Sequence, residues 1–304
     1  MIQMKKITSI LAIILVAMLG IAGCSPKEKI INDREGNEVK LPTKMDRIIS
    51  TAPSNTEVLV ELGLADKLVG VDTYSGDIEG INKDIAKIDF LKPDAEAIIA
   101  LDPDIIIASG HNKTGSSEDP FKLIKEAGIS VVYIPSSESI QGIYDDTMFI
   151  ADITDKKKEG QKIVDDMKKQ IQEIKAIGDT ITDKKKVYFE IAPAPGLYSF
   201  GNSTFLNEMV ELVGAENIFK DQKSWISPSE EAIIDANPDV ILTNVDYVKN
   251  SLESIKSRKG WENINAVKNN NVFLIDKNAS SRPSQHAVKA LKEMATAIYP
   301  DKFK

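Results

Sequence analysis

The sequence is poor in the residue types that form disulfides and metal sites. Among its 304 residues Cys24 is the only cysteine, so no disulfide can form within the chain. It has two histidines, His111 and His286, whereas a metal-ion site needs several convergent His, Asp or Glu ligands. A metal-ion binding protein is therefore a poor interpretation. We expect His286, at the start of the last predicted helix, to be structural.

Motifs for ATP hydrolysis and serine hydrolysis are also missing. The sequence contains no P-loop. Ser54 lies at a predicted helix start, but no G-x-S-x-G motif surrounds it and no histidine is placed to act as its base. The sequence thus predicts a protein that is not an enzyme and that carries no cofactor and no metal of its own.

Basic residues are too few for a nucleic-acid partner. Lys and Arg number 38 against 46 Asp and Glu, a net charge of −8. Removing residues 1–23 deletes two lysines and no acid, and 36 against 46 gives −10. Nucleic-acid binding relies on clustered cations, so a basic protein surface or a basic ligand fits better.

Residues 1–23 have the pattern of a secretory signal. Two lysines precede the apolar run Ile10–Ile21, which is shorter than the roughly 20 residues of a membrane-spanning helix. The segment is similar to a bacterial lipoprotein signal, with Ile21–Cys24 as its lipobox. This similarity predicts an extracytoplasmic chain that is anchored to the membrane by lipid on Cys24, with residues 24–45 as a tether. The alternative is a simple cleaved signal with an incidental cysteine.

One thirteen-residue pattern occurs twice, as Ala95–Ile107 and Glu230–Leu242. Seven positions are identical: a Glu-Ala-Ile-Ile run, a Pro-Asp pair and one isoleucine. Each copy predicts a short helix, a proline stop and a buried parallel strand. Two copies this far apart predict two lobes that are built alike.

Strands alternate with helices in both halves, which predicts an α/β fold of two Rossmann-like lobes with parallel sheets, residues 46–138 and 179–304. Between them, residues 139–178 have apolar residues at helical spacing. We expect a helix to about Asp152 there and then a second, long helix, Asp155–Ile177, capped by Thr154 or Asp155. It would be about 35 Å long, enough to join the lobes. The alternative is an ordinary surface helix of one lobe.

Local signals also predict where elements begin. Ser54 and Glu57 form a capping-box pattern, and Ser227 precedes Pro228 in the same way before the second repeat. Glu61 is expected on a solvated face. The principal strands are predicted at Arg47–Thr51, Leu68–Val71, Val131–Ile134, Lys186–Ile191 and Val272–Ile275.

A resemblance to a known family covers nearly all of the chain after the signal. It rests on three features: the motif Pro53–Glu57, the repeat in both halves and the long connecting helix. The chain resembles the substrate-binding lipoproteins of ABC importers for cobalamin, iron-siderophores and haem, and most closely the vitamin B12-binding members. The resemblance implies a class III periplasmic-binding-protein architecture. It also implies a monomer that passes a small-molecule ligand to a permease dimer with its ATPase.

The same resemblance implies four aromatic residues that bind ligand in a cleft between the lobes: Tyr74, Phe90, Tyr198 and Trp225. Two of them lie on loops after predicted strands, and the carboxyl ends of parallel strands face the crevice. Aromatic faces there would sandwich a large ring-rich ligand, each adding about 0.5–1.5 kcal/mol beyond area burial. The alternative for each is packing within a lobe.

Glu96 and Glu231 occupy equivalent positions in the two repeats, and the resemblance implies that they dock onto the permease. Each is expected in the first turn of its helix, where the helix dipole alone favours an acid. Two acids at matched places in two lobes could instead engage two arginines of a symmetric dimer.

Two further residues are candidates for the cleft. His111 follows a strand and could ligate a metal centre carried by the ligand, or be only a polar loop residue. Arg282 could pair with a phosphate or carboxylate of the ligand, or be exposed to solvent. We expect cobalamin or another corrinoid as ligand, then an iron-siderophore, then haem. The candidate from another class of protein is a surface adhesin.

Overall fold

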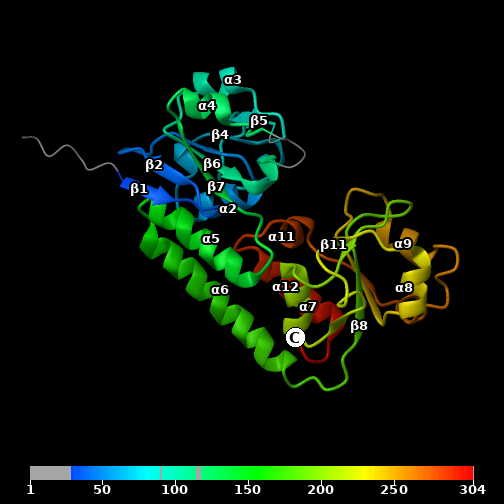
Figure 1. Cartoon of the computed structure of the whole chain (residues 1–304). Coiled ribbons are helices and arrows are strands. Elements are labelled where there is room, and N and C mark those ends of the chain that lie inside the picture. The colour runs from blue at the N-terminus through cyan, green and yellow to red at the C-terminus, as the bar shows by residue number, and fades with distance from the viewer. Residues whose placement is uncertain (1–28, 90, 114–117, 304) are drawn as a thin grey trace, which may run out of the picture.

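The computed structural model describes residues 29–89, 91–113 and 118–303, and they form two α/β lobes joined by two helices (Figure 1). The predicted signal, Cys24 and Phe90 lie outside the described residues. The α/β fold with parallel sheets is confirmed. Among the described residues, no helix is both long and apolar enough to cross a bilayer.

The N-terminal lobe is built on a five-stranded parallel sheet in the order β5-β4-β3-β6-β7. The chain starts in the middle, moves outward on one side, then crosses to the other side. Neighbouring strands β3 and β6 therefore mark the switch point, where a crevice opens at the carboxyl ends. The strands are β3 (Ile48–Ser50), β4 (Leu68–Asp72), β5 (Ala86–Ile88), β6 (Ile105–Ser109) and β7 (Ser130–Ile134).

The C-terminal lobe repeats this logic with a four-stranded parallel sheet in the order β10-β8-β12-β13. Its switch point lies between β8 and β12. A two-stranded antiparallel ribbon, β9 with β11, lies apart from the sheet. The strands are β8 (Lys186–Glu190), β9 (Ser199–Phe200), β10 (Glu216–Asn217), β11 (Trp225–Ile226), β12 (Val240–Thr243) and β13 (Val272–Leu274).

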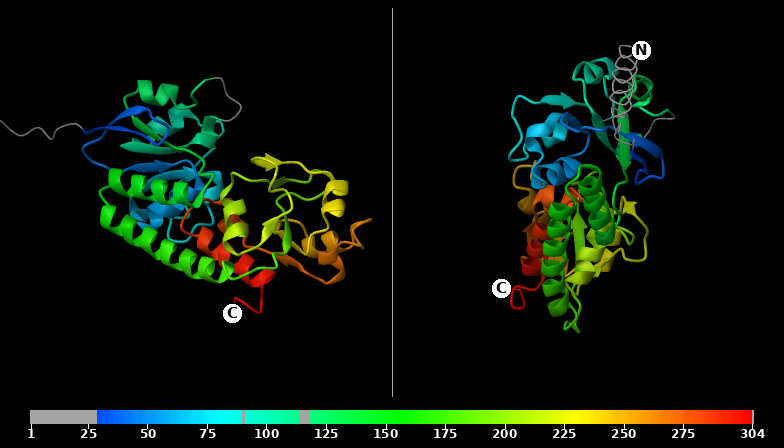
Figure 2. Two further views of the ribbon diagram at one scale, coloured as in Figure 1. Left: turned by 60° about the horizontal axis from the view of Figure 1, so that its bottom comes forward. Right: turned by 90° about the vertical axis from the view of Figure 1, so that its left-hand side faces the viewer.

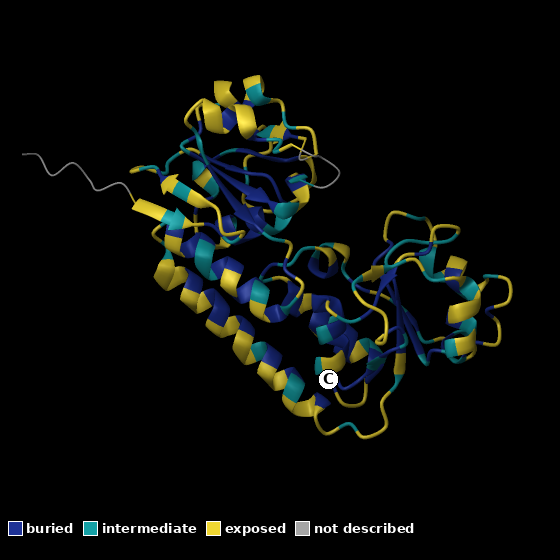
Figure 3. Ribbon diagram, viewed as in Figure 1, coloured by how far each residue is buried: buried dark blue, intermediate teal, exposed yellow. Residues whose placement is uncertain are grey.

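Helices surround both sheets, and the strands between them are largely buried (Figure 3). In the N-terminal lobe these are α2 (Pro53–Glu61), α3 (Ala95–Ala100) and α4 (Lys122–Glu126). In the C-terminal lobe they are α7 (Phe205–Leu212), α8 (Glu230–Ala236), α9 (Ser251–Lys256), α10 (Asn265–Lys268), α11 (Lys277–Ser281) and α12 (Ala287–Ile298).

The sequence repeat corresponds to one structural unit used in each lobe. It forms α3 and β6 in the first copy and α8 and β12 in the second. The residue before the proline has a left-handed backbone in both, with φ of 47° at Asp102 and 48° at Asn237. This conformation ends the helix and turns the chain into the strand.

The aspartate after each proline fastens the unit to the first strand of its lobe. The N–H of Arg47 donates to Asp104 Oδ2 over 2.9 Å, and the N–H of Lys186 donates to Asp239 Oδ2 over 2.9 Å. Their own N–H groups donate back to the carbonyl oxygens of the same two residues. The shared Pro-Asp pair therefore sets how β6 and β12 align with β3 and β8.

The predicted long helix is present as α6 (Lys157–Gly178), which pairs with α5 (Ile140–Ile153) in a helical hairpin. Its 22 residues span about 33 Å, from α5 at one end to α7 and α12 at the other (Figure 2). Its buried residues recur at helical spacing: Gly160, Ile163, Val164, Met167, Ile171, Ile174 and Gly178. The expected cap was wrong: Lys156 precedes the helix and makes no side-chain cap bond, because Asp155 adopts a left-handed turn.

Other local expectations were also wrong. Helix α2 begins at Pro53 after Ala52, without a side-chain cap, so Ser54 and Glu57 do not form a capping box. Ser229, not Ser227, caps α8, and its hydroxyl accepts from the N–H of Ala232. Helix α2 thus begins one residue before the expected cap Ser54, and α8 (Glu230–Ala236) begins three residues after the expected cap Ser227.

Part of the expected tether is folded. Residues 29–41 form an antiparallel hairpin of β1 (Lys29–Asn32) and β2 (Glu38–Leu41). Asp33 in its turn accepts from the N–H of Tyr133 on β7 over 3.0 Å, and Arg34 Nε donates to Asp146 on α5 over 2.6 Å. The hairpin is thus attached to the N-terminal lobe and the connector.

Two glycines allow the connector to approach its neighbours closely. A Cβ on Gly178 would lie 2.2 Å from the carbonyl oxygen of Leu212, and one on Gly160 would lie 2.3 Å from Ala151 Cβ. We expect Gly178→Ala to lower the free energy of unfolding by about 1–3 kcal/mol, because backbone must move to admit the methyl group.

Denaturant unfolding of purified protein measures this change. Gly196→Ala is the matched control, since a Cβ there meets nothing within 4 Å, and we expect it to change stability by less than about 0.5 kcal/mol. Equal stability of the two variants would show that the α6–α7 contact does not constrain the connector.

Candidate ligand-binding cleft

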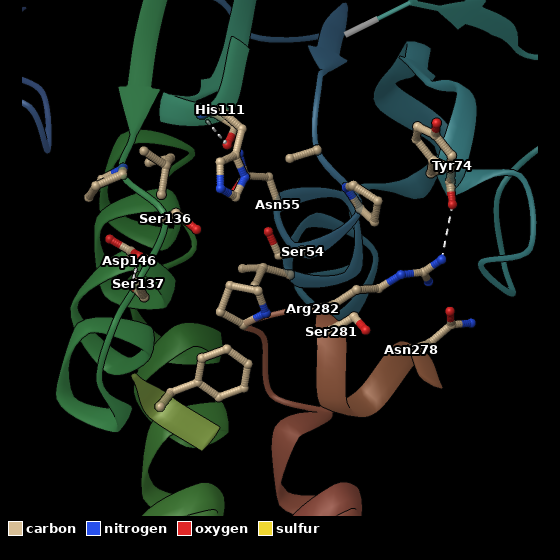
Figure 4. A pocket seen from close by; sticks show the side chains of 18 of the residues that line it. Ser54, Asn55, Tyr74, His111, Ser136, Ser137, Asp146, Asn278, Ser281 and Arg282 are labelled. Atoms are coloured by element: carbon tan, nitrogen blue, oxygen red, sulfur yellow. Dashed lines mark hydrogen bonds between the residues drawn. The ribbon is translucent and has the colours of Figure 1, made fainter. Parts of the chain in front are cut away.

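A cleft of about 670 Å³ lies between the two lobes (Figure 4). Its N-terminal wall comes from segments that follow the carboxyl ends of β3, β4, β6 and β7, as the switch point predicts. Its other wall comes from the start of α7, from β11 and from α11 with the loop after it. The volume is within the usual range for small-molecule sites.

Aromatic side chains stand at the two edges of the cleft. On the C-terminal side, Trp225 lines it and remains 41% exposed. The ring of Tyr198 stacks against Trp225, with centroids 6.2 Å apart and planes at 12°, and Phe200 meets the same indole edge-on. On the N-terminal side, Tyr74 is 64% exposed. Large ring faces are thus available to a ligand from both lobes.

Polar side chains cover the interior. Ser54 and Asn55 come from the first turn of α2, and His111 from the 3₁₀ turn after β6; Figure 4 shows these three grouped together. Ser136 and Ser137, from the loop after β7, lie to one side of them in the same view. Among the described residues, no three His, Cys, Asp or Glu side chains are grouped to hold a metal ion.

Arg282 links the two lobes at one side of the cleft. Its Nη1 donates to Glu57 Oε1 of α2 over 2.8 Å, and its Nη2 donates to Asp77 Oδ1 over 2.8 Å and to the Tyr74 carbonyl over 2.9 Å. Ser284 Oγ donates to the second oxygen of Glu57 over 2.5 Å. We call Glu57, Arg282 and Asp77 the inter-lobe clasp.

Hydrogen bonds within the clasp favour the charged forms of Arg282 and Asp77. Burial opposes the charge on Arg282, but its bonds to Glu57 and Asp77 outweigh this and raise its pKa. Burial likewise opposes ionisation of Asp77, yet bonds from Arg282 and Asn278 lower its pKa. Glu57 is buried within α2, so the earlier assignment of this residue to a helix cap is replaced by an ion pair across the lobes.

The other charged residues of the cleft are also paired, with one exception. Lys277 bonds Asp246 over 3.0 Å, and Asp146 bonds Arg34 over 2.6 Å. Burial raises the pKa of Asp146, although Ser137 and Arg34 oppose this. Glu138 is exposed and has no ion-pair partner in the described part of the chain. The lining therefore offers no unpaired Lys or Arg to an anionic ligand.

The structure brings together most of the residues predicted for the site. Tyr74, His111, Trp225 and Arg282 line the cleft, whereas Tyr198 lies against Trp225 and supports it. Phe90 lies outside the described residues, so its predicted role stays a prediction. Arg282 reaches the cleft but is already bonded to two carboxylates.

Sequence reasoning missed several lining residues, chiefly Asn55, Ser109, Ser137, Glu138 and Phe205. The first four follow parallel strands closely, so a search of strand ends for polar residues would have found them. Phe205 begins α7 after the cap residue Thr204, and nothing local in the sequence distinguishes it from a core residue.

The predicted docking acids are placed alike in the two lobes. Glu96 and Glu231 are both exposed, each at the second position of its helix, α3 or α8. A backbone hydrogen bond, followed by one from Ser229, lowers the pKa of Glu231. Figure 1 shows α3 and α8 at the far ends of the two lobes, both away from α6.

We expect Arg282→Ala to lower the free energy of unfolding by about 3–5 kcal/mol, because it leaves Glu57 buried without its counter-ion. Denaturant unfolding measures the loss. Lys175→Ala removes an exposed pair with Asp179 on α6 and is expected to cost less than about 0.5 kcal/mol. A cost below 1 kcal/mol for the arginine variant would contradict a stabilising clasp.

Comparisons with known proteins agree with this architecture. The family model described as "Periplasmic binding protein" matches residues 48–279. An uncharacterized ABC transporter substrate-binding lipoprotein, YvrC of Bacillus subtilis, is 33% identical over 99% of this chain and 100% of its own length. A vitamin B12-binding protein of Vibrio campbellii is 27% identical, over 82% of this chain and 87% of its own.

A solved structure is similar as well. The crystal structure of a possible iron-binding (periplasmic solute-binding) protein from Staphylococcus epidermidis superposes with a TM-score of 0.75. It is 34% identical and covers 84% of this chain and 100% of its own. Proteins of this kind bind solutes outside the cytoplasm for a permease and its ATPase and are not enzymes. With its two parallel-sheet lobes and the cleft between them, the chain belongs to the periplasmic binding protein family, as a substrate-binding component of an ABC importer.

Proposed function

We propose that the protein captures cobalamin or a related corrinoid in the cleft and delivers it to its permease. The observation that carries this proposal is the combination of aromatic faces on both lobes with a lining that has no unpaired cation in the described residues. A corrinoid is a broad ring system whose rim carries uncharged carboxamides, so it offers rings to stack and no multiple negative charge to neutralise. The relative from Vibrio campbellii bears the name of a vitamin B12-binding protein, which supports the same choice.

Haem is an alternative candidate, and His111 is the observation that favours it. An imidazole in a cleft can ligate haem iron. Haem also carries two carboxylates, however, and the described lining has no unpaired Lys or Arg to receive them. Titrating the purified protein with cyanocobalamin, dicyanocobinamide, haem and a ferric siderophore ranks these ligands directly.

We expect Trp225→Ala to weaken cyanocobalamin binding at least tenfold, because it removes an exposed ring face at the edge of the cleft and the partner of Tyr198. Isothermal titration calorimetry measures the change. The fold should persist, since the residue lies on a two-residue strand outside the main sheet.

Tyr247→Ala is the matched control, because Tyr247 is exposed and does not line the cleft. Intrinsic fluorescence gives a second readout. The chain has two tryptophans, and Trp261 is buried in the C-terminal lobe. If cyanocobalamin quenches the tryptophan fluorescence of the wild type but not that of Trp225→Ala, the ligand lies beside Trp225. Unchanged affinity in that variant would remove Trp225 from the site.

Docking onto the permease is proposed to use Glu96 and Glu231. Each acid lies three positions before an isoleucine of the same repeat, Ile99 or Ile234, and residues three apart share one helix face. Ile99 is exposed and Ile234 is partly buried, so each tip presents an acid beside apolar surface. Such a surface suits a partner that supplies an arginine and an apolar contact.

The double variant Glu96→Ala, Glu231→Ala is expected to bind cyanocobalamin normally and to abolish its uptake by cells. Uptake is measured with radiolabelled cyanocobalamin in a strain that lacks the native gene. Replacing Glu61 and Glu253 together, which leaves both tips intact, should leave uptake unchanged. Normal uptake by the first double variant would refute the docking role.

Anchoring through lipid on Cys24 is also proposed, on the strength of the lipobox-like sequence Ile21–Cys24. The Bacillus subtilis relative is named a lipoprotein, which supports it. In a bacterial host, we expect a labelled fatty acid to be incorporated into the wild type and not into Cys24→Ser. Equal labelling of both would contradict the assignment.

A further inference from the structure

One polar group beside the cleft has no partner. Asn55 is 4% exposed and lines the cleft, and its Nδ2 is a buried donor without an acceptor in the described part of the chain. A buried donor without an acceptor destabilises the folded protein, because it has lost its hydrogen bond to water. That cost is recovered when a bound molecule supplies the missing acceptor oxygen.

The backbone around Asn55 is held in place. The hydroxyl Oγ1 of its neighbour Thr56 lies within hydrogen-bond distance of the Ala52 carbonyl oxygen, at 3.0 Å, and of Ser50 Oγ, at 2.8 Å. The next residue, Glu57, is fixed by Arg282 and Ser284. The turn of α2 that carries Asn55 is therefore fixed, so a ligand in the cleft meets this residue at a defined position.

The charge of the lining points to the same kind of ligand. Arg282 carries one positive charge between two carboxylates, and Lys277 is paired with Asp246. Glu138 lines the cleft and is exposed, in the loop that also supplies Ser136 and Ser137. A ligand carboxylate or oxyanion would meet an unpaired negative charge and no free cation of the described lining.

We infer that Asn55 and Glu138 determine specificity, selecting a neutral or cationic ligand that presents a carboxamide or carbonyl oxygen to Asn55. This inference rests on the proposed function and sharpens it, since it distinguishes carboxamide-bearing corrinoids from carboxylate-bearing forms of the same ring. Asn55 acts by recognising uncharged acceptors, and Glu138 acts by repelling anions.

The first test is Asn55→Leu, which has a similar size and no donor. We expect its affinity for cyanocobalamin to fall about tenfold in calorimetry, while the melting temperature of the ligand-free protein stays equal or rises, because no donor is left unsatisfied. Asn112→Leu is the matched control. Asn112 is also buried but accepts from Thr51 and from the N–H of Ser109, so its loss should lower the melting temperature.

A lower melting temperature for Asn55→Leu with unchanged affinity would make Asn55 a structural residue and overturn the inference.

The second test compares cyanocobalamin with its monocarboxylate hydrolysis products, in which one carboxamide has become a carboxylate. The wild type should bind the monocarboxylates at least tenfold more weakly, and Glu138→Gln should narrow this difference at least threefold. Equal binding of the two ligands by the wild type overturns the inference and leaves the corrinoid assignment standing. Failure of the wild type to bind any corrinoid overturns both.

Discussion

The guanidinium of Arg282 is the contact on which the arrangement of the cleft depends. It belongs to the C-terminal lobe, yet its three hydrogen bonds go to Glu57, Asp77 and the carbonyl of Tyr74 in the N-terminal lobe. Glu57 is buried, so its two carboxylate oxygens accept hydrogen bonds from Arg282 and Ser284 rather than from water. A buried pair of this kind adds little net stability by itself, but it strongly disfavours separation of its partners. The clasp therefore fixes where the lobes meet.

Helix α6 supplies the complementary constraint on the outside of the molecule. It crosses from the N-terminal to the C-terminal lobe as one uninterrupted helix, packed against α5 at one end and against α7 and α12 at the other (Figure 1). Close packing at Gly160 and Gly178 leaves no room for the helix to slide. Because a helix joins the lobes on one side and an ion pair on the other, we expect little freedom for large hinge motion. On that expectation, most of the cleft is formed before a ligand arrives.

Much of this architecture could be predicted because its signals are local. The repeat gives the helix, the turn and the strand in each lobe, and the apolar spacing of residues 157–178 gives the connector. The clasp could not be predicted, because Glu57 and Arg282 are 225 positions apart and each has a plausible local explanation. Glu57 fits a capping pattern, and Arg282 fits an exposed loop. The hairpin at 29–41 was missed for a related reason: its strands are short and mostly exposed, and it is held by contacts with distant elements, among them β7 and α5.

The clasp also connects the stability of the fold with the chemistry of the cleft. Arg282 is a positive charge at the wall of the cleft, and on sequence alone it is a natural partner for a ligand phosphate or carboxylate. The guanidinium already forms ion pairs with Glu57 and Asp77. Releasing either one to bind an anion would leave a carboxylate without its counter-ion. An anionic ligand that binds Arg282 must therefore compete with the contact that links the lobes. Under the proposed function, a neutral ring that binds Tyr74 and Trp225 would leave that contact intact.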